Sequence, residues 1–190
     1  GYLDLLHTDA ASAERKFVFK DILFRYGHAN HIRAKNSPGL VVFLRCEARM
    51  STSDLYNFHW DINGAISRMH AIIADCTGFD AGIIGNGITG NVSNNCVTSH
   101  ETVSLIVING QFERSFGGTF AGIGDSNTFI AGGVWRDGKG DTIMGGGYPA
   151  ITIQTEDTAK CWIYRGIIDG LVHACRANGS SNIYLKGTVI

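Results

Sequence analysis

The sequence predicts an all-β protein, a right-handed parallel β-helix (a solenoid) made of coils of roughly 21 to 24 residues. A short pattern recurs at near-constant spacing, and no long stretch has the periodicity of an α-helix. Glycine accounts for 25 of the 190 residues and proline for 2, a balance typical of a chain with many tight turns. In such a fold each coil buries its inner face against its neighbours.

The recurring pattern is an apolar residue, any residue, glycine, any residue and a second apolar residue. Its glycines are separated by 22, 34 and 21 residues, at Gly110, Gly132, Gly166 and Gly187. We interpret the 34-residue step as one coil that carries a Gly- and Asp-rich loop at 136–147. The spacing is more regular than that of a β-sandwich, which would also show more hairpin signals.

The N-terminal half repeats more loosely. Similar segments begin at Phe19, Phe43 and Ile73, at steps of 24 and 30 residues. We therefore expect a single β-helix segment over residues 1–190, with an irregular entry over 1–16.

Helical periodicity is confined to residues 10–16 and 62–70, which allows one short helix near the N-terminus. Neither end carries a polar cap, so we expect the chain to be a piece of a longer protein.

Composition and charge exclude several classes of function. A net charge of −1 gives no electrostatic reason to expect a nucleic-acid partner. No apolar run approaches the roughly 20 residues that a membrane-spanning helix needs, and no signal peptide is expected in this chain. Five cysteines without a CxxC pair predict buried thiols rather than metal or disulfide sites: Cys46, Cys76, Cys96, Cys161 and Cys175.

The repeat also predicts which side chains point outward. If Ile108 and Phe112 face the core, strand alternation turns Asn109 and Gln111 to solvent. Stacking equivalent positions then gives three outward columns. These are Asn109, Ala131, Arg165 and Lys186; then Gln111, Gly133, Ile167 and Thr188; then Glu113, Trp135, Asp169 and Ile190.

The third column is the main candidate site. It places Trp135, an aromatic platform for sugar binding, between the carboxylates of Glu113 and Asp169. Two coils separate the acids, so their backbones should lie roughly 10 Å apart. Their carboxyl groups could then fall near the roughly 6.5 to 9.5 Å separation of inverting glycosidases. The alternative is that these are ordinary carboxylates on solvated strands.

Other candidates lie beside this column. Arg165 and Lys186, on adjacent coils, would suit an anionic sugar or act as the base of an elimination, unless they simply splay into water. Gln111 is a further substrate-binding candidate. Asp137 and Asp141, in the most polar loop, are candidate acids; a Ca²⁺ site there is the weaker expectation, since an ordinary solvated turn explains them too. We expect no other cofactor or metal.

With the Ile-x-Gly-x-Val repeats and the Ser-Asn turns at 126–127 and 181–182, the chain resembles the pectate-lyase-like β-helix superfamily. Within it, the chain is most similar to bacteriophage tailspike and tail-appendage proteins. The resemblance implies a homotrimer that binds bacterial surface polysaccharide. It also implies an extracellular location on the virion, and cleavage of the polysaccharide by a glycoside hydrolase or polysaccharide lyase reaction where the protein is an enzyme.

Two other functions remain open. One is a structural or adhesive β-helix stalk without catalysis, whose carboxylates would be scattered with no groove between them. The other is a secreted pectate-lyase-like polysaccharide lyase.

Overall fold

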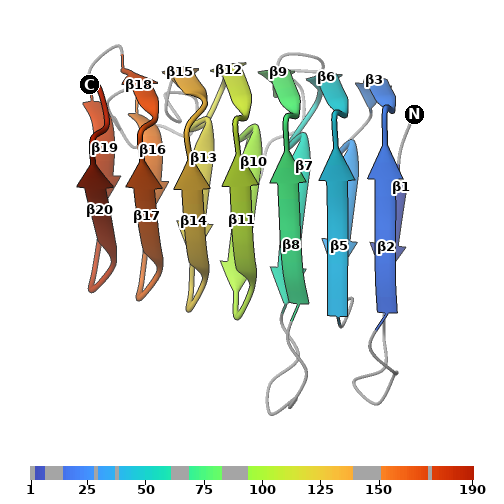
Figure 1. The fold of residues 1–190 in the computed structure, drawn as a ribbon, viewed down its shortest axis with the longest axis horizontal. Helices are drawn as coiled ribbons and strands as arrows, with labels where there is room; N and C mark the ends of the chain where they lie inside the picture. Colours follow the sequence, from blue (N-terminus) through green and yellow to red (C-terminus); the bar gives the residue numbers. More distant parts are fainter. Residues whose placement is uncertain are drawn as a thin grey trace.

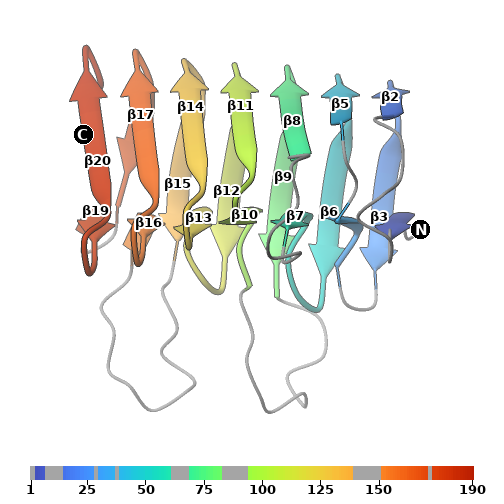
Figure 2. The same cartoon turned by 90° about the horizontal axis from the view of Figure 1, so that it is seen from below.

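The computed structural model describes residues 3–6, 15–27, 30–36, 39–60, 69–82, 94–138, 151–170 and 173–190. Within these ranges every regular element is a β-strand, and the strands form three parallel sheets. Each strand pairs with the strand three places earlier and the strand three places later, so three consecutive strands make one coil. Successive coils lie side by side along one axis, as Figures 1 and 2 show. This arrangement is consistent with the predicted parallel β-helix.

The three sheets are named here by their order along a coil. Sheet A contains β1 (Leu3–Leu6), β4 (Ile32–Lys35), β7 (Tyr56–Trp60), β10 (Val97–Glu101), β13 (Phe120–Ile123), β16 (Ile151–Thr155) and β19 (His173–Ala177). Sheet B contains β2 (Arg15–Lys20), β5 (Gly39–Leu44), β8 (Met69–Ala74), β11 (Ser104–Ile108), β14 (Asn127–Ala131), β17 (Lys160–Tyr164) and β20 (Asn182–Lys186). Sheet C contains β3 (Leu23–Gly27), β6 (Glu47–Ser51), β9 (Thr77–Ala81), β12 (Gln111–Ser115), β15 (Val134–Gly138) and β18 (Ile167–Asp169).

The expected register of the N-terminal half is confirmed, because Phe19 pairs with Phe43 and Phe43 with Ile73. Strand β1 already belongs to sheet A, where it pairs with β4. The short helix that the sequence allows near the N-terminus falls mostly outside the described residues, and the described ends of both helical stretches are strands. Residues 15–16 lie in β2 and residues 69–70 in β8, and the rest of both stretches lies outside the described residues.

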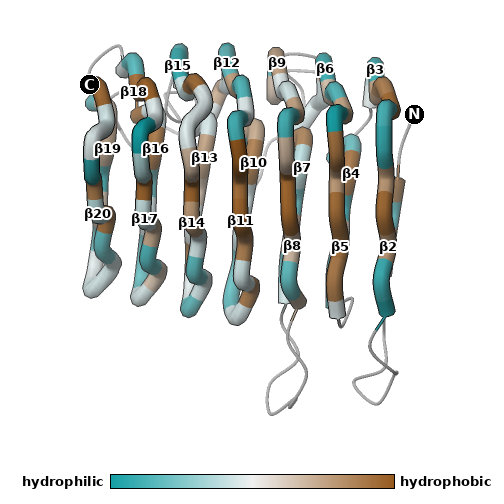
Figure 3. Tube along the Cα trace, viewed as in Figure 1, coloured by the Kyte–Doolittle hydropathy of each residue, from teal (hydrophilic) through white to brown (hydrophobic). Residues whose placement is uncertain are grey.

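Inward side chains form a core whose central feature is a continuous chain of aromatic contacts. The ring centroids of Phe19 and Phe43 lie 5.0 Å apart, and those of Phe43 and Tyr56 lie 5.7 Å apart. Tyr56 contacts Phe112 at 6.0 Å. Strands β5, β8 and β11 are hydrophobic along their middle (Figure 3), on both faces in places. This core joins the coils along the solenoid axis.

In every coil, the turn from sheet B to sheet C begins with a residue that has a positive φ. These first residues are Asp21, Arg45, Asp75, Asn109, Gly132, Arg165 and Gly187, with φ between 50° and 70°; after Gly132, Gly133 also has a positive φ of 87°. The left-handed region suits Gly, Asn and Asp. Where the chain uses Asn109 or Arg165 there, the motif glycine follows it. Where the chain uses Gly132 or Gly187, the motif glycine is itself the left-handed residue.

The outward columns expected from the motif are therefore displaced by one residue in two coils. The register pairs Gln111 with Val134 and Glu113 with Arg136. The expectation that Ile108 faces the core is also wrong, because its side chain is 38% exposed and the neighbouring Val107 is buried. A motif aligned on glycine cannot distinguish the two turn positions that glycine occupies.

Candidate functional site

The outer face of sheet C carries the most interconnected charged side chains of the described residues. Strand β12 presents Gln111 and Glu113 outward and buries Phe112. The next residue, Arg114, has φ 55°, and its equivalents Asp80 and Asp137 have φ 65° and 56°. This left-handed residue adds one position to each strand, as in a β-bulge, so that two consecutive side chains project from the same face.

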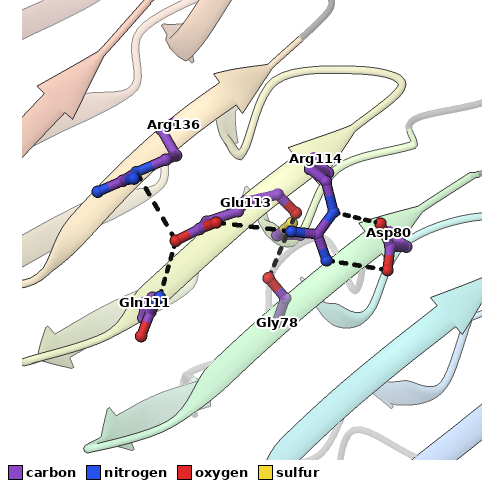
Figure 4. Close-up of polar contacts among 7 residues, drawn as sticks. Gly78, Asp80, Gln111, Glu113, Arg114 and Arg136 are labelled. Atoms are coloured by element: carbon purple, nitrogen blue, oxygen red, sulfur yellow. Dashed lines mark hydrogen bonds and ion pairs between the residues drawn. The ribbon is translucent and has the colours of Figure 1, made fainter.

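Glu113 lies at the centre of this group (Figure 4). Its Oε1 accepts a hydrogen bond of 2.7 Å from Gln111 Nε2. Arg136 Nε lies 3.7 Å from the same oxygen, and Arg114 Nη1 lies 3.6 Å from Oε2. The Glu113 side chain is only 12% exposed, so its negative charge is compensated by two guanidinium groups rather than by bulk water.

Arg114 links Glu113 to the neighbouring coil. Its Nε and Nη2 donate to the two carboxylate oxygens of Asp80 at 2.7 and 3.1 Å, a bidentate pair. The hydrogen bonds to Asp80, together with the charges of Asp80, Glu113 and Asp137, raise the pKa of Arg114. The cation is thereby held in one orientation on the surface.

Phe79 extends the group toward the N-terminus. The guanidinium of Arg49 lies 4.9 Å from its ring centroid and that of Arg114 lies 5.3 Å from it. Arg49 Nε also pairs with Glu47 Oε1 at 2.5 Å. We call these residues the sheet C cluster: Arg49, Phe79, Asp80, Gln111, Glu113, Arg114 and Arg136.

The backbone beneath the cluster is fixed from the inside by Cys96. Its thiol lies 3.6 Å from the carbonyl oxygens of both Gly78 and Glu113, to which it can donate. Burial raises the pKa of this thiol, so it remains a neutral donor. Strands β9 and β12, which carry most of the cluster, are therefore held together on both faces.

The expected alignment of Glu113 with Asp169 is confirmed. Glu113 pairs with Arg136, and Arg136 pairs with Asp169, so the two acids stand two strands apart in one column. Their backbones are then roughly 10 Å apart. The residue between them is Arg136, however, and not the expected tryptophan.

Trp135 does not lie on the surface, and its expected exposure is wrong. It is fully buried and packs against Phe112 at 4.6 Å and Phe120 at 6.1 Å between ring centroids. The cause is the double glycine at 132–133. Both glycines lie in the turn, so Trp135 aligns with the inward Phe112 rather than with Glu113.

Arg165 and Lys186 are not opposed across adjacent coils, contrary to expectation. Lys186 pairs with Tyr164, and Arg165 aligns with Gly187 at the turn. The Arg165 guanidinium instead lies 4.9 Å from the ring centroid of Tyr164. Lys186 is the last residue of β20 and Arg165 lies in the turn after β17, so both are outside the sheet C cluster.

The two candidate acids of the polar loop, Asp137 and Asp141, have different outcomes. Asp137 is the left-handed residue of β15, beside the cluster, whereas Asp141 lies outside the described residues. Among the side chains that the structure describes, no group of three or more His, Cys, Asp or Glu is arranged to hold a metal ion.

Sequence reasoning missed five members of the cluster: Arg49, Phe79, Asp80, Arg114 and Arg136. A sequence signal was available for the Asp80–Arg114 pair. Strict alternation turns Arg114 inward, because it follows the outward Glu113. The 34-residue step from Asp80 to Arg114, which equals the step from Asp75 to Asn109, was the available signal.

A second surface of note covers the outer face of sheet B. Its middle column is apolar in all seven strands and contains Val18, Val42, Ile72, Ile106, Phe129, Trp162 and Tyr184. Trp162 is 37% exposed, and its ring is stacked on that of Tyr184 at 5.5 Å and 11°. Because these two rings face each other, what this pair presents to a ligand is chiefly ring edges, so it is a poor platform for a sugar ring.

Comparisons with known proteins give no assignment: no family model, curated protein or solved structure matches this chain. No helix in the described part of the chain is long and apolar enough to cross a membrane.

Proposed function

We propose that the sheet C cluster binds a polysaccharide, and that the chain is part of a right-handed parallel β-helix of the tailspike type. The observation that carries the proposal is the fixed arrangement of Asp80, Arg114, Glu113 and Arg136 on one flat face. Carboxylate and guanidinium groups offer planar, bidentate acceptors and donors that suit adjacent sugar hydroxyls.

Preorganisation supports this proposal. Each cluster side chain already has an ionic, hydrogen-bond or ring contact, so a ligand would not need to immobilise free, long side chains. The face repeats at the strand spacing of about 4.8 Å, and a linear polymer lying along the axis would meet Arg49, Phe79 and Glu113 in succession.

The wider assignment follows from the same proposal. The protein would be a homotrimeric, extracellular component of a virion tail that engages bacterial surface polysaccharide. As a catalyst it would act as a glycoside hydrolase, with Glu113 and Asp169 on either side of the scissile bond. Arg136 would contact the sugar between them.

A structural or adhesive stalk is the second candidate. The observation that favours it is the mutual compensation of the cluster charges, since ion-pair ladders also occur on surfaces that bind nothing.

The test is incubation of the protein with capsular polysaccharides, O-antigens, exopolysaccharides and polygalacturonate. Retention on the polymer, new reducing ends and the ultraviolet absorbance of unsaturated sugars are followed together. Reducing ends without absorbance, abolished in Glu113→Gln and Asp169→Asn, would establish hydrolysis at this site. Absorbance would establish a lyase.

If the protein is retained on a polysaccharide without cleaving it, and Glu113→Gln weakens this retention, the protein is a polysaccharide-binding protein and not an enzyme for that polymer. No retention on a panel that includes the host's own polysaccharide would refute the proposal and favour the stalk.

A further inference from the structure

Two cysteines occupy the same turn position on adjacent coils. Cys46 follows the left-handed Arg45, and Cys76 follows the left-handed Asp75. The amide of Thr77 donates to the carbonyl of Cys46 at 2.9 Å, which fixes the register of the two coils at this point. Both side chains point inward and both thiols are free.

A hydrogen bond links the two cysteines directly. The backbone amide of Cys46 donates to Cys76 Sγ at 3.3 Å. Adjacent parallel strands lie about 4.8 Å apart, which is within the Cα separation of roughly 4.4 to 6.8 Å that disulfides span. The pair can therefore be bridged without moving the backbone of either coil far.

The two thiols also differ in protonation. The hydrogen bond with Cys76 is the main cause that lowers the pKa of Cys46, and the same bond, with burial, raises the pKa of Cys76. Cys46 is thus the more acidic thiol of the pair. Cys46 is also one residue from the exposed turn at Arg45.

We propose that Cys46 and Cys76 form a redox pair that is converted to an inter-coil disulfide by a peroxide. The Cys46 thiolate attacks one oxygen of hydrogen peroxide, which gives a sulfenic acid on Cys46 and releases hydroxide. The Cys76 thiol then attacks the Cys46 sulfur. A sulfur–sulfur bond forms, and the sulfenic hydroxyl leaves with the thiol proton as water.

The other three thiols provide internal controls. Burial raises the pKa of Cys96 and of Cys161, and raises that of Cys175 to about 11. Cys96 Sγ contacts the carbonyls of Gly78 and Glu113, and among the described residues it makes no hydrogen bond with another cysteine, unlike the sulfur of Cys76. Cys161 and Cys175 lie close enough for the charge of Cys175 to affect Cys161, yet neither thiol activates the other by a hydrogen bond. They should resist the conditions that oxidise Cys46.

The disulfide would join two coils across a 30-residue segment. A cross-link of this kind restricts the unfolded chain more than the folded one, so the oxidised protein should melt at a higher temperature. The bond would stabilise the two coils that carry Arg49 and Phe79 of the sheet C cluster, but it would form in the core and not between cluster side chains. Its formation is therefore independent of whether the cluster binds a polysaccharide.

The experiment is treatment of the folded protein with hydrogen peroxide, followed by blocking of free thiols, intact mass measurement and non-reducing peptide mapping. The expected result is the loss of two hydrogen atoms and one linked peptide pair that contains Cys46 and Cys76. Cys46→Ser and Cys76→Ser should lose this product, and Cys161→Ser should retain it.

Three outcomes would overturn the proposal: oxygen addition at Cys46 without a cross-link, a cross-link that uses other cysteines, or no reaction of the folded protein under conditions that oxidise the unfolded chain. If a serine variant fails to fold, the peptide map of the unaltered protein decides alone.

Discussion

Truncation of Trp135 should destabilise the protein strongly. The side chain is fully buried, and its ring contacts Phe112 and Phe120 within the aromatic core. Replacing a buried aromatic side chain by alanine leaves a cavity and typically costs about 3–5 kcal/mol. We expect Trp135→Ala to lower the free energy of unfolding by this amount, because a solenoid layer is held on both sides by neighbouring coils that cannot collapse freely.

The indole nitrogen of Trp135 makes a sharper version of the test possible. It is buried and has no hydrogen-bond partner among the described residues. An unsatisfied buried donor costs about 1–3 kcal/mol, so its removal offsets the loss of ring area in Trp135→Phe. We therefore expect Trp135→Phe to change the free energy of unfolding by no more than about 1 kcal/mol, although it removes part of the same ring system.

The assay is equilibrium unfolding in urea, followed by far-ultraviolet circular dichroism so that the signal does not depend on the tryptophans. Trp162→Ala is the matched control, because Trp162 is 37% exposed, and it should cost less than about 1.5 kcal/mol. Equal effects of Trp135→Ala and Trp162→Ala, both below that value, would refute the assigned register. Trp135 would then lie on the surface, in the column with Glu113 and Asp169.

Two further predictions concern stability. Burial, and then the charge of His59, lower the pKa of His100 to about 4, so the folded state favours the neutral imidazole. The resulting stability is complete above about pH 6.5 and is lost as the pH falls toward 4. His100→Gln should flatten this part of a stability–pH curve measured by thermal melting. Gly133 has φ 87°, and a Cβ there would lie 2.3 Å from the carbonyl oxygen of Gly110, so Gly133→Ala should cost at least about 2 kcal/mol in urea unfolding. The equivalent Gly166→Ala should cost much less, because the nearest atom to a Cβ there would be Ile163 Cγ2 at 3.3 Å and the nearest backbone atom would lie at 3.5 Å. Similar losses in both variants would contradict the turn geometry.

The fold class and the length of the coil could be predicted from the sequence because they depend on a periodic signal. Apolar positions and turn glycines recur wherever neighbouring coils must stack, so the steps from Phe19 to Phe43 and Ile73 identify equivalent residues directly. The alignment of Glu113 with Asp169 followed from the same periodicity.

The details of the site depended on backbone geometry that the sequence does not display. A left-handed residue can be Asn109 in one coil and Gly132 in the next, and this one-residue ambiguity reversed the orientation assigned to Trp135. The left-handed Arg114 broke the alternation on which the outward columns were based. Strand alternation therefore could not indicate its pairing with Asp80, for which the 34-residue step was the only sequence signal.

The measurement that tests the central claim most directly compares two arginines in matched environments. Arg114 and Arg45 each make a bidentate pair with an aspartate on the preceding coil, and their side chains are 46% and 47% exposed. Binding of the best-retained polysaccharide of the panel is measured by titration calorimetry for Arg114→Ala and Arg45→Ala. We expect Arg114→Ala to weaken binding at least about tenfold, which corresponds to about 1.4 kcal/mol, and Arg45→Ala to leave it within about twofold. Equal affinities in the two variants would show that the sheet C cluster is not the binding site.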